Sequence, residues 1–455
     1  MNRTKSRPLA AAIGITTAIL LAGCAPGSGQ RTDTAEVEEI TEPVTVEQVA
    51  DLGDVTLRVW ADAGEESMLD ALVQQYEETY DNVTVDVTIK GWDDLMGTVV
   101  NAMNGDNAPD VTNGNQGFAI MGTMVKGGML RPIDDVISAY GIDEGLPESG
   151  FDSMRWNADG TQWGSGSIYG MGGATQPLGL FYNRAKLDAL GLEVPDSIGE
   201  LEEALAAAKA GGETPIQLGN SDQYPLGSHV LGILINMYAA PAKVNEWIAG
   251  GSDASFDSPG IRAALDKLAE WGEKGYFAPG YDGRSLDDAV GAYGEGDGVF
   301  FLGGSFNGSK LAAVDPDAFG YTLLRAESGE YVTTGTFGTP WHISSKSSIQ
   351  PAAIAFLSMM LSEDFAQTYA DNSRLPVADL DGVTATGSMH QSQLDAAQAL
   401  FADGAFVGYL DWATPTMQRT LGAGAQELLG GQMSVDEFIE SVQSDWSDYQ
   451  TERTG

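Results

Sequence analysis

Polar side chains that follow expected strands are the residues of this chain best placed to do chemistry. They are Asp62, Glu65, Asn115, Gln116 and Asp411, the last of which directly precedes Trp412. Ligands of open α/β sheets bind beyond the carboxyl ends of strands. Carboxylates and amides exchange hydrogen bonds there, and an aromatic ring covers an apolar face. The pattern predicts a binding site, although each residue taken singly also suits a turn or a helix cap.

Signals for catalysis are sparse. The three histidines, His229, His342 and His390, lack the spacing of a metal site, and His342 alternates into an expected strand. The chain has no nucleophile-elbow serine, phosphate loop or zinc signature. A glycosidase needs two carboxylates at a set separation, but with 65 acidic residues some pair will lie near any site. We therefore expect a protein that is not an enzyme, with no metal and no cofactor.

The single cysteine, Cys24, closes an N-terminal export pattern. Basic residues at 3, 5 and 7 precede an apolar run over 9–20 and then Leu21-Ala22-Gly23-Cys24. The run is too short to span a bilayer, which takes roughly 20 residues. The segment resembles a bacterial lipoprotein signal, which implies removal of residues 1–23 and lipidation of Cys24. We expect a lipid anchor on the extracytoplasmic face of the cell membrane. An ordinary signal peptide with an incidental cysteine is the alternative.

Charge and cysteine content exclude several classes of partner. Removal of residues 1–23 takes away three of the 23 basic residues and no acidic ones, so the net charge goes from −42 to −45. Nucleic acid is excluded as a partner because phosphate binding needs clustered Lys and Arg. Anionic lipid headgroups would repel such a surface, so attachment to the bilayer must come from the lipid. The mature chain cannot form an internal disulfide, and we expect a monomer.

Hydrophobic periodicity predicts an α/β body after a linker. Residues 24–52 are rich in Pro, Gly, Ser, Thr and Glu and predict an acidic linker. Strands are expected over 55–60 and 83–89, and helices over 66–80 and 95–103. Further helix starts are expected at Ser197, Ser258-Pro259, Pro351 and Ser434. The alternation of strands and helices implies a mostly parallel sheet covered on both faces.

Six blocks in order resemble the family 1 extracellular solute-binding proteins, the sugar-capturing lipoproteins of ABC importers. The blocks lie at 59–60, 107–111, 126–134, 180–184, 293–306 and 341–346. The resemblance covers nearly all of 55–450. It implies a two-lobe fold of the periplasmic-binding-protein type, with discontinuous lobes at 55–177 with 336–385 and at 178–335 with 386–455. Segments around 176–180 and 334–340 would serve as hinges.

The same resemblance implies sugar capture and adds site residues. A mono- or oligosaccharide would bind between the lobes and pass to the permease subunits of an ABC transporter. Trp92, Phe306, Trp341 and Trp412 would then stack on sugar faces, with Trp60 equally suited to the core. Phe306 stands where the family often has Trp. A membrane-tethered carbohydrate-active enzyme, or the same fold holding another solute, remains an alternative.

Overall fold

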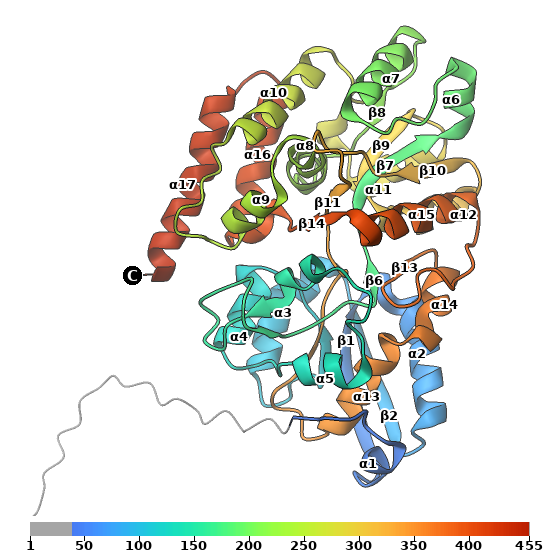
Figure 1. Cartoon of the computed structure of the whole chain (residues 1–455), viewed down its shortest axis with the longest axis vertical. Helices are drawn as coiled ribbons and strands as arrows, with labels where there is room; N and C mark the ends of the chain where they lie inside the picture. Colours follow the sequence, from blue (N-terminus) through green and yellow to red (C-terminus); the bar gives the residue numbers. More distant parts are fainter. Residues whose placement is uncertain (1–38, 455) are drawn as a thin grey trace, which may run out of the picture. The chain divides into compact units, whose positions relative to one another are not determined.

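The first of two four-stranded sheets holds the N-terminal strands in the computed structural model, which describes residues 39–454 (Figure 1). Its order is β12-β3-β1-β2, with β1 (Val55–Asp62), β2 (Val83–Lys90), β3 (Val111–Asn113) and β12 (Trp341–Ile343). Strand β1 pairs in parallel with β2 and β3, whereas β12 runs antiparallel to β3. The parallel α/β pattern expected for this region is confirmed. Helices α2 (Glu66–Thr79) and α3 (Trp92–Asn104) supply the crossovers.

The second sheet is mixed. Its order is β10-β7-β9-β8, with β7 (Leu178–Asn183), β8 (Ile216–Gln217), β9 (Phe300–Gly304) and β10 (Phe319–Thr322). Strand β7 runs antiparallel to both neighbours, and only β8 and β9 are parallel. All six residues of β7 are buried, as in a strand covered on both faces.

Short strand pairs and two crossing segments connect the regions around the two sheets. Strand β6 (Ala174–Thr175) pairs with β13 (Leu375–Pro376), and β11 (Val332–Thr334) pairs with β14 (Ala405–Val407). The crossing segments, 172–177 and 335–340, lie side by side, and Thr175 Oγ1 donates to Thr336 O at 3.0 Å. Gly338 has a φ of +77°, and a Cβ there would lie 2.1 Å from Ala174 O, so only glycine fits.

Local capping signals place the helices. Ser197 opens α7 (Ile198–Ala210) by accepting from the Glu200 N–H, and Ser258 opens α10 (Pro259–Glu273) in the same way. Ser434 and Glu437 form a reciprocal capping box at the start of α17 (Val435–Thr454). The helix expected at Pro351 is α13 (Gln350–Met360). These four predicted helices are confirmed, because a cap needs only residues that are neighbours in sequence.

The remaining helices and short strands fill the space between these elements. They are α4 (Thr123–Lys126), α5 (Asp134–Tyr140), α6 (Arg184–Leu190), α8 (Leu231–Tyr238), α9 (Pro241–Ile248), α11 (Leu286–Gly294), α12 (Gly308–Val314), α14 (Glu363–Asp371), α15 (Ser388–Asp403), α16 (Met417–Leu429), β4 (Arg155–Trp156) and β5 (Ser167–Ile168). No helix of the described residues is both long enough and apolar enough to cross a membrane.

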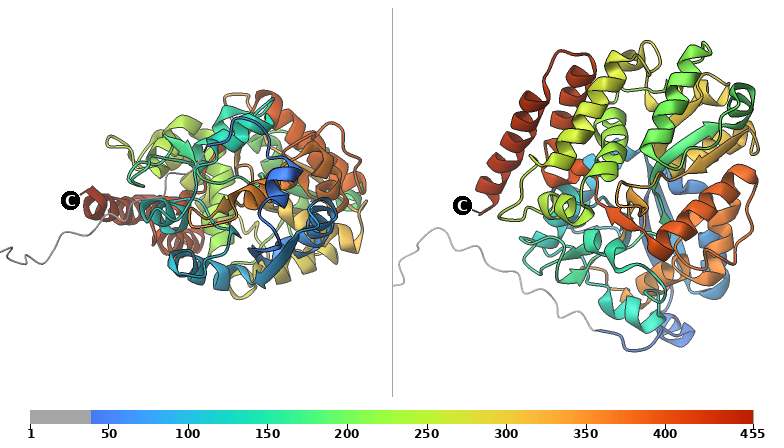
Figure 2. Two further views of the ribbon diagram at one scale, coloured as in Figure 1. Left: turned by 90° about the horizontal axis from the view of Figure 1, so that it is seen from below. Right: turned by 45° about the horizontal axis from the view of Figure 1, so that its top comes forward.

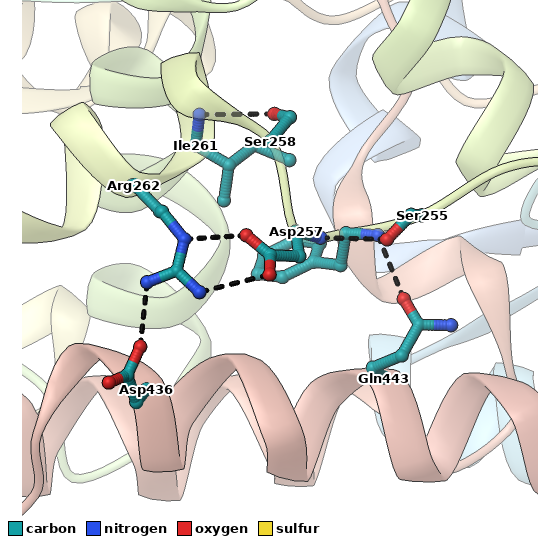
Figure 3. Close-up of polar contacts among 8 residues, drawn as sticks. Ser255, Asp257, Ser258, Ile261, Arg262, Asp436 and Gln443 are labelled. Atoms are coloured by element: carbon teal, nitrogen blue, oxygen red, sulfur yellow. Dashed lines mark hydrogen bonds and ion pairs between the residues drawn. The ribbon is translucent and has the colours of Figure 1, made fainter.

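The C-terminal helix α17 is fixed to its neighbours at its first half. Figures 1 and 2 show α10, α16 and α17 side by side. Arg262 of α10 donates to Asp257 at 2.6 Å and to Asp436 of α17 at 2.7 Å (Figure 3). Gln443 of α17 accepts from the Phe256 N–H at 2.8 Å. The aromatic core beneath includes Trp271, which is fully buried.

The linker expected over 24–52 ends earlier than predicted. Helix α1 (Val46–Ala50) begins with a capping box between Thr45 and Gln48, and Val49 is fully buried. Asn82 donates to the carbonyls of Val49 and Gly53, which holds this segment against the body. Two buried valines among polar residues were too weak a hydrophobic signal to reveal this packing. The signal segment 1–23, Cys24 and the linker up to 38 lie outside the described residues.

Candidate functional site

Two predicted site segments meet at a glycine. Gly117 has a φ of +80°, and a Cβ on it would lie 2.8 Å from Trp412 Cβ and 2.9 Å from Trp412 O. Only glycine permits this approach. It brings the segment that follows β3, directly after Asn115 and Gln116, against Trp412 in the turn η8 (Leu410–Ala413). The two segments, which carry four of the predicted site residues, are about 300 positions apart in sequence and meet at this contact.

Aromatic rings next to Gly117 and Trp412 form a continuous series of ring contacts, called the aromatic row below. The members of this aromatic row are Phe118, Trp163, Trp412, Tyr409, His229 and Phe306, with neighbouring ring centroids 5.6, 6.0, 5.0, 6.1 and 5.9 Å apart in that order. Trp156 stacks on Trp163 at 5.6 Å with an interplanar angle of 7°. Phe118 and Trp163 come from the first predicted lobe and the other four from the second.

Three buried polar atoms beside the row have no hydrogen-bond partner among the described residues. They are Ser228 Oγ, His229 Nδ1 and Asp411 Oδ1. Ser228 and His229 lie in the turn η5 (Pro225–Val230) and are 2% and 3% exposed. Leaving a buried polar group unsatisfied costs about 1–3 kcal/mol. Such groups point to a missing ligand or water, because folded proteins satisfy nearly all of the others.

The electrostatics of this cluster suit an uncharged, hydroxyl-rich ligand. Burial raises the pKa of Asp411, and the nearby Ser228 hydroxyl opposes this rise. The geometry between the two side chains does not meet the criteria for a hydrogen bond. Burial lowers the pKa of His229 to about 4, so its ring is neutral at pH 7. A neutral imidazole offers one donor and one acceptor, and a carboxylate accepts only. The three groups together match the donors and acceptors of hydroxyl groups.

Gln116 and Asn115 contribute to the same region in different ways. Gln116 is 3% exposed, and its Nε2 donates to Gly338 O at 2.8 Å in the crossing segment 335–340. Asn115 Oδ1 accepts from the Gln116 N–H at 3.0 Å. Gln116 therefore links the predicted site to a predicted hinge.

Trp92 and Phe306 are the two aromatic side chains among the described residues that combine large size with exposure, at 39% and 37%. Phe306 ends the aromatic row. Trp92 opens α3, next to Asp93. Burial, followed by the charges of Asp222, Asp287 and Asp93, raises the pKa of Tyr224, whose ring lies 5.3 Å from that of His229. Among the described residues, no ring contact connects Trp92 to the row.

The other predicted site residues have contacts of their own outside the row. Asp62 accepts from the Gly64 N–H at 2.9 Å as a cap, and the carboxylate of Glu65 pairs with Arg374 at 2.8 Å. Trp341 is 2% exposed in β12, where its backbone pairs with that of Met171. No ring contact joins Trp341 to the row within residues 39–454.

Tyr409, His229 and Trp163 are not among the site residues predicted from the sequence. Tyr409 stands three residues before Trp412 in the same loop, so its spacing was a usable signal. His229 lies in an apolar stretch without the spacing of a metal site, so no signal in the sequence pointed to it. Trp163 joins the row only through folding of the 156–163 segment. Within the part of the chain that the structure describes, no group of three or more His, Cys, Asp or Glu side chains is placed to hold a metal ion.

Comparisons with known proteins agree on one family. The model of the bacterial extracellular solute-binding proteins matches residues 71–380. A multiple sugar-binding protein of Streptococcus mutans is 23% identical over 204 residues, which cover 44% of this chain and 49% of that protein. The match thus spans about half the length of that relative.

Solved structures share the fold over most of the chain. A chitin oligosaccharide binding protein superposes with a TM-score of 0.72 at 20% identity, covering 88% of this chain and 99% of that one. The protein RafE in complex with raffinose gives a TM-score of 0.69 at 17% identity, covering 87% and 99%. The α/β fold expected from the sequence is therefore that of solved sugar-binding proteins.

Proposed function

Because this chain belongs to the family of bacterial extracellular solute-binding proteins, we propose that it captures a mono- or oligosaccharide outside the cell and delivers it to the permease of an ABC transporter. The relatives named for sugar, chitin oligosaccharide and raffinose support a carbohydrate ligand. The ligand leaves the site unchanged, so the protein acts in capture and not in catalysis.

The observation that carries this proposal is the aromatic row with its three unpartnered polar atoms. Sugars present an apolar C–H face and a rim of hydroxyl groups. Trp412 and Tyr409 supply rings for the face, and Asp411, His229 and Ser228 supply partners for the rim. A sugar would satisfy polar atoms that are otherwise buried without a hydrogen bond, which is a direct gain in binding free energy.

Closure of two lobes completes the proposal. The lobes would be 55–177 with 336–385 and 178–335 with 386–455, rotating about the crossing segments. This closure is supported by contacts of Trp412, in the second proposed lobe, with Gly117 and with the ring of Trp163, both in the first. Most rings of the row are buried, so a ligand must enter while the lobes are apart. Hinge closure around ligands is a known motion of two-lobe binding proteins.

The anchor and the partners follow from the N-terminal sequence and the family. Cys24 would carry lipid and hold a monomer at the outer face of the cell membrane, close to the permease. The strongly negative charge of the chain would keep the body from lying on anionic lipid, so the segment from 24 to about 43 acts as a tether.

The test is a titration of the protein with galactose, raffinose and chito-oligosaccharides by calorimetry. We expect one of these sugars to bind at one site, and Trp412→Ala to weaken that binding by tenfold or more, because truncating a stacked anchor commonly costs about 2 kcal/mol. Trp271→Ala is the control, since it removes a core ring far from the row and should lower stability by about 3–5 kcal/mol with little effect on affinity.

Two outcomes would contradict the proposal. The first is absence of binding across a wide panel of sugars, with a non-sugar solute bound instead. The second is conversion of the bound oligosaccharide during overnight incubation, which would make the protein an enzyme. Normal sugar binding by Trp412→Ala would remove the row from the site.

A further inference from the structure

We propose that Asn245 and Asp445 are positioning residues of the sugar site, which act on the ligand only through the loop that carries two of its rings. This loop, called the site loop below, covers residues 408–416 between β14 and α16 and contains Tyr409 and Trp412. The inference rests on the proposed sugar capture, because it explains how the rings assigned to that site are held in place.

Asp445 of α17 holds the end of the site loop that leads into α16. Its Oδ1 accepts from the Thr414 hydroxyl at 2.6 Å and from the Thr416 hydroxyl at 2.9 Å, and its Oδ2 accepts from the Thr420 hydroxyl. Thr414 stands two residues after Trp412 and is buried. Hydrogen bonds to a charged acceptor are roughly twice as strong as those between neutral groups. One carboxylate therefore ties this end of the loop both to α17 and to the start of α16.

Asn245 of α9 holds the opposite end of the site loop. Its Nδ2 donates to Phe406 O at 3.0 Å, and its Oδ1 accepts from the Gly408 N–H at 2.9 Å, directly before Tyr409. Both polar groups of the carboxamide bind the backbone, so an aspartate of the same shape would lose the donated bond. The site loop is thus held by a side chain at each end.

The two positioning residues stand on helices that are bonded to each other. Trp446, next to Asp445, donates from its Nε1 to Trp247 O at 2.8 Å, and Trp247 stands two positions after Asn245. Both tryptophans are buried, and their ring centroids lie 6.4 Å apart. A binding group keeps its geometry when packed side chains of rigid elements support it. The site loop is therefore ordered before sugar arrives, and binding loses less entropy in ordering it.

The first measurement is amide hydrogen exchange of the sugar-free protein over 408–416. We expect Asp445→Ala and Asn245→Asp each to speed exchange there about tenfold, because release of one end makes local opening easier. Gln443→Ala is the matched control, since it removes a bond between the same helix and the Phe256 N–H, outside the site loop. It should leave exchange over 408–416 at the value of the parent.

The second measurement is calorimetry with whichever of galactose, raffinose and chito-oligosaccharide the parent binds. We expect Asp445→Ala to weaken binding about fivefold or more, since only molecules with an ordered site loop are competent to bind. Asp445→Asn, which keeps one accepting oxygen, should lose less. Gln443→Ala should keep the affinity of the parent, even where its urea midpoint falls as far as that of Asp445→Ala.

A double-mutant cycle separates positioning from a general loss of stability. Asp445→Ala combined with Trp412→Ala should weaken sugar binding by less than the product of the two single changes, because both act through the same ring. The urea midpoint of Asp445→Ala should fall by the same amount with or without Trp412→Ala.

Each result has a defined meaning. Unchanged exchange over 408–416 in Asp445→Ala, or unchanged affinity, overturns the proposal while sugar capture stands. An equal loss of affinity in Gln443→Ala, or single changes that multiply in the cycle, overturns it as well. Absence of sugar binding by the parent contradicts sugar capture itself, and exchange then decides alone whether the two residues hold the loop. Where Asp445→Ala does not fold, Asp445→Asn and Asn245→Asp carry the same test.

Discussion

Asp411 illustrates the conflict between stability and binding at single residues of the site. Burial raises its pKa, which means that the folded state disfavours the ionised form. The resulting loss of stability is absent below the unfolded pKa and grows as the pH rises through the folded value. At pH 7.5 we expect Asp411→Asn to stabilise the sugar-free protein by roughly 1 kcal/mol in urea unfolding, and to weaken sugar binding about tenfold by calorimetry, because a charge-assisted bond is lost. Asp70→Asn, on an exposed helix face, is the control. A less stable Asp411→Asn with normal affinity would contradict this role.

Single residues also show how far sequence reasoning extends. Asp411 with Trp412, and Asn115 with Gln116, were predicted because each pair follows a strand or loop of recognisable pattern, and the segments that hold them meet where Gly117 contacts Trp412. The salt bridge of Glu65 with Arg374 joins residues more than 300 positions apart, so no local sequence pattern predicts it. Alternation in β12 predicts which side chains share a face of the strand. It does not predict that other elements cover both faces, and this cover leaves Trp341 only 2% exposed.

At the scale of elements, α17 connects the two predicted lobes. Its start is tied to α10 through Asp436 and Arg262, and its end reaches the first lobe, where the Arg453 guanidinium lies 4.9 Å from the ring centroid of Phe118 and donates to Thr161 O. We expect Arg453→Ala to weaken sugar binding by about fivefold in calorimetry, since a partly buried cation–π contact contributes about 1 kcal/mol, and to enlarge the radius of gyration of the sugar-free protein in X-ray scattering. Arg262→Ala, which alters only the other end of the helix, should leave both values unchanged. Equal effects of the two variants would show that α17 acts only through the second lobe.

The elements themselves differ in how well sequence predicts them. Helices with a Ser cap or a first-turn Pro were predicted because four neighbouring residues decide the start. The mixed second sheet was not, because the partners of β7 lie more than 100 residues further along the chain. A fully buried strand gives the same apolar run in either orientation.

The whole molecule is predicted to act at a membrane surface, and Cys24 decides this. Because a single acyl chain binds a bilayer only weakly, a firm anchor needs the multiple acylation that a lipoprotein cysteine receives. We expect Cys24→Ser to leave the protein either in the soluble extracellular fraction or with its signal uncut, as shown by fractionation and mass of the mature chain. Ser28→Ala, four residues further on, should behave as the parent. Processed Cys24→Ser that stays with membranes would disprove the lipid anchor.

The free energy of unfolding should depend on pH because His229 and His342 are buried. Burial lowers the pKa of both His229 and His342 to about 4, against about 6.5 in the unfolded chain, so the unfolded state binds more protons at mildly acidic pH. Stability contributed by the neutral rings is present above pH 6.5 and is lost as the pH falls toward 4. Asp411 acts in the opposite direction, since its pKa is raised. Comparing the parent with His342→Asn isolates the contribution of His342, because all other titratable groups are shared. Between pH 7.5 and pH 5, the free energy of unfolding in urea should fall by about 2 kcal/mol more for the parent than for His342→Asn. Every other titratable group is present in both proteins and therefore drops out of this difference. A difference that does not vary with pH would mean that the ring of His342 accepts a proton in the folded protein, and its unpartnered Nε2 would then be open to solvent.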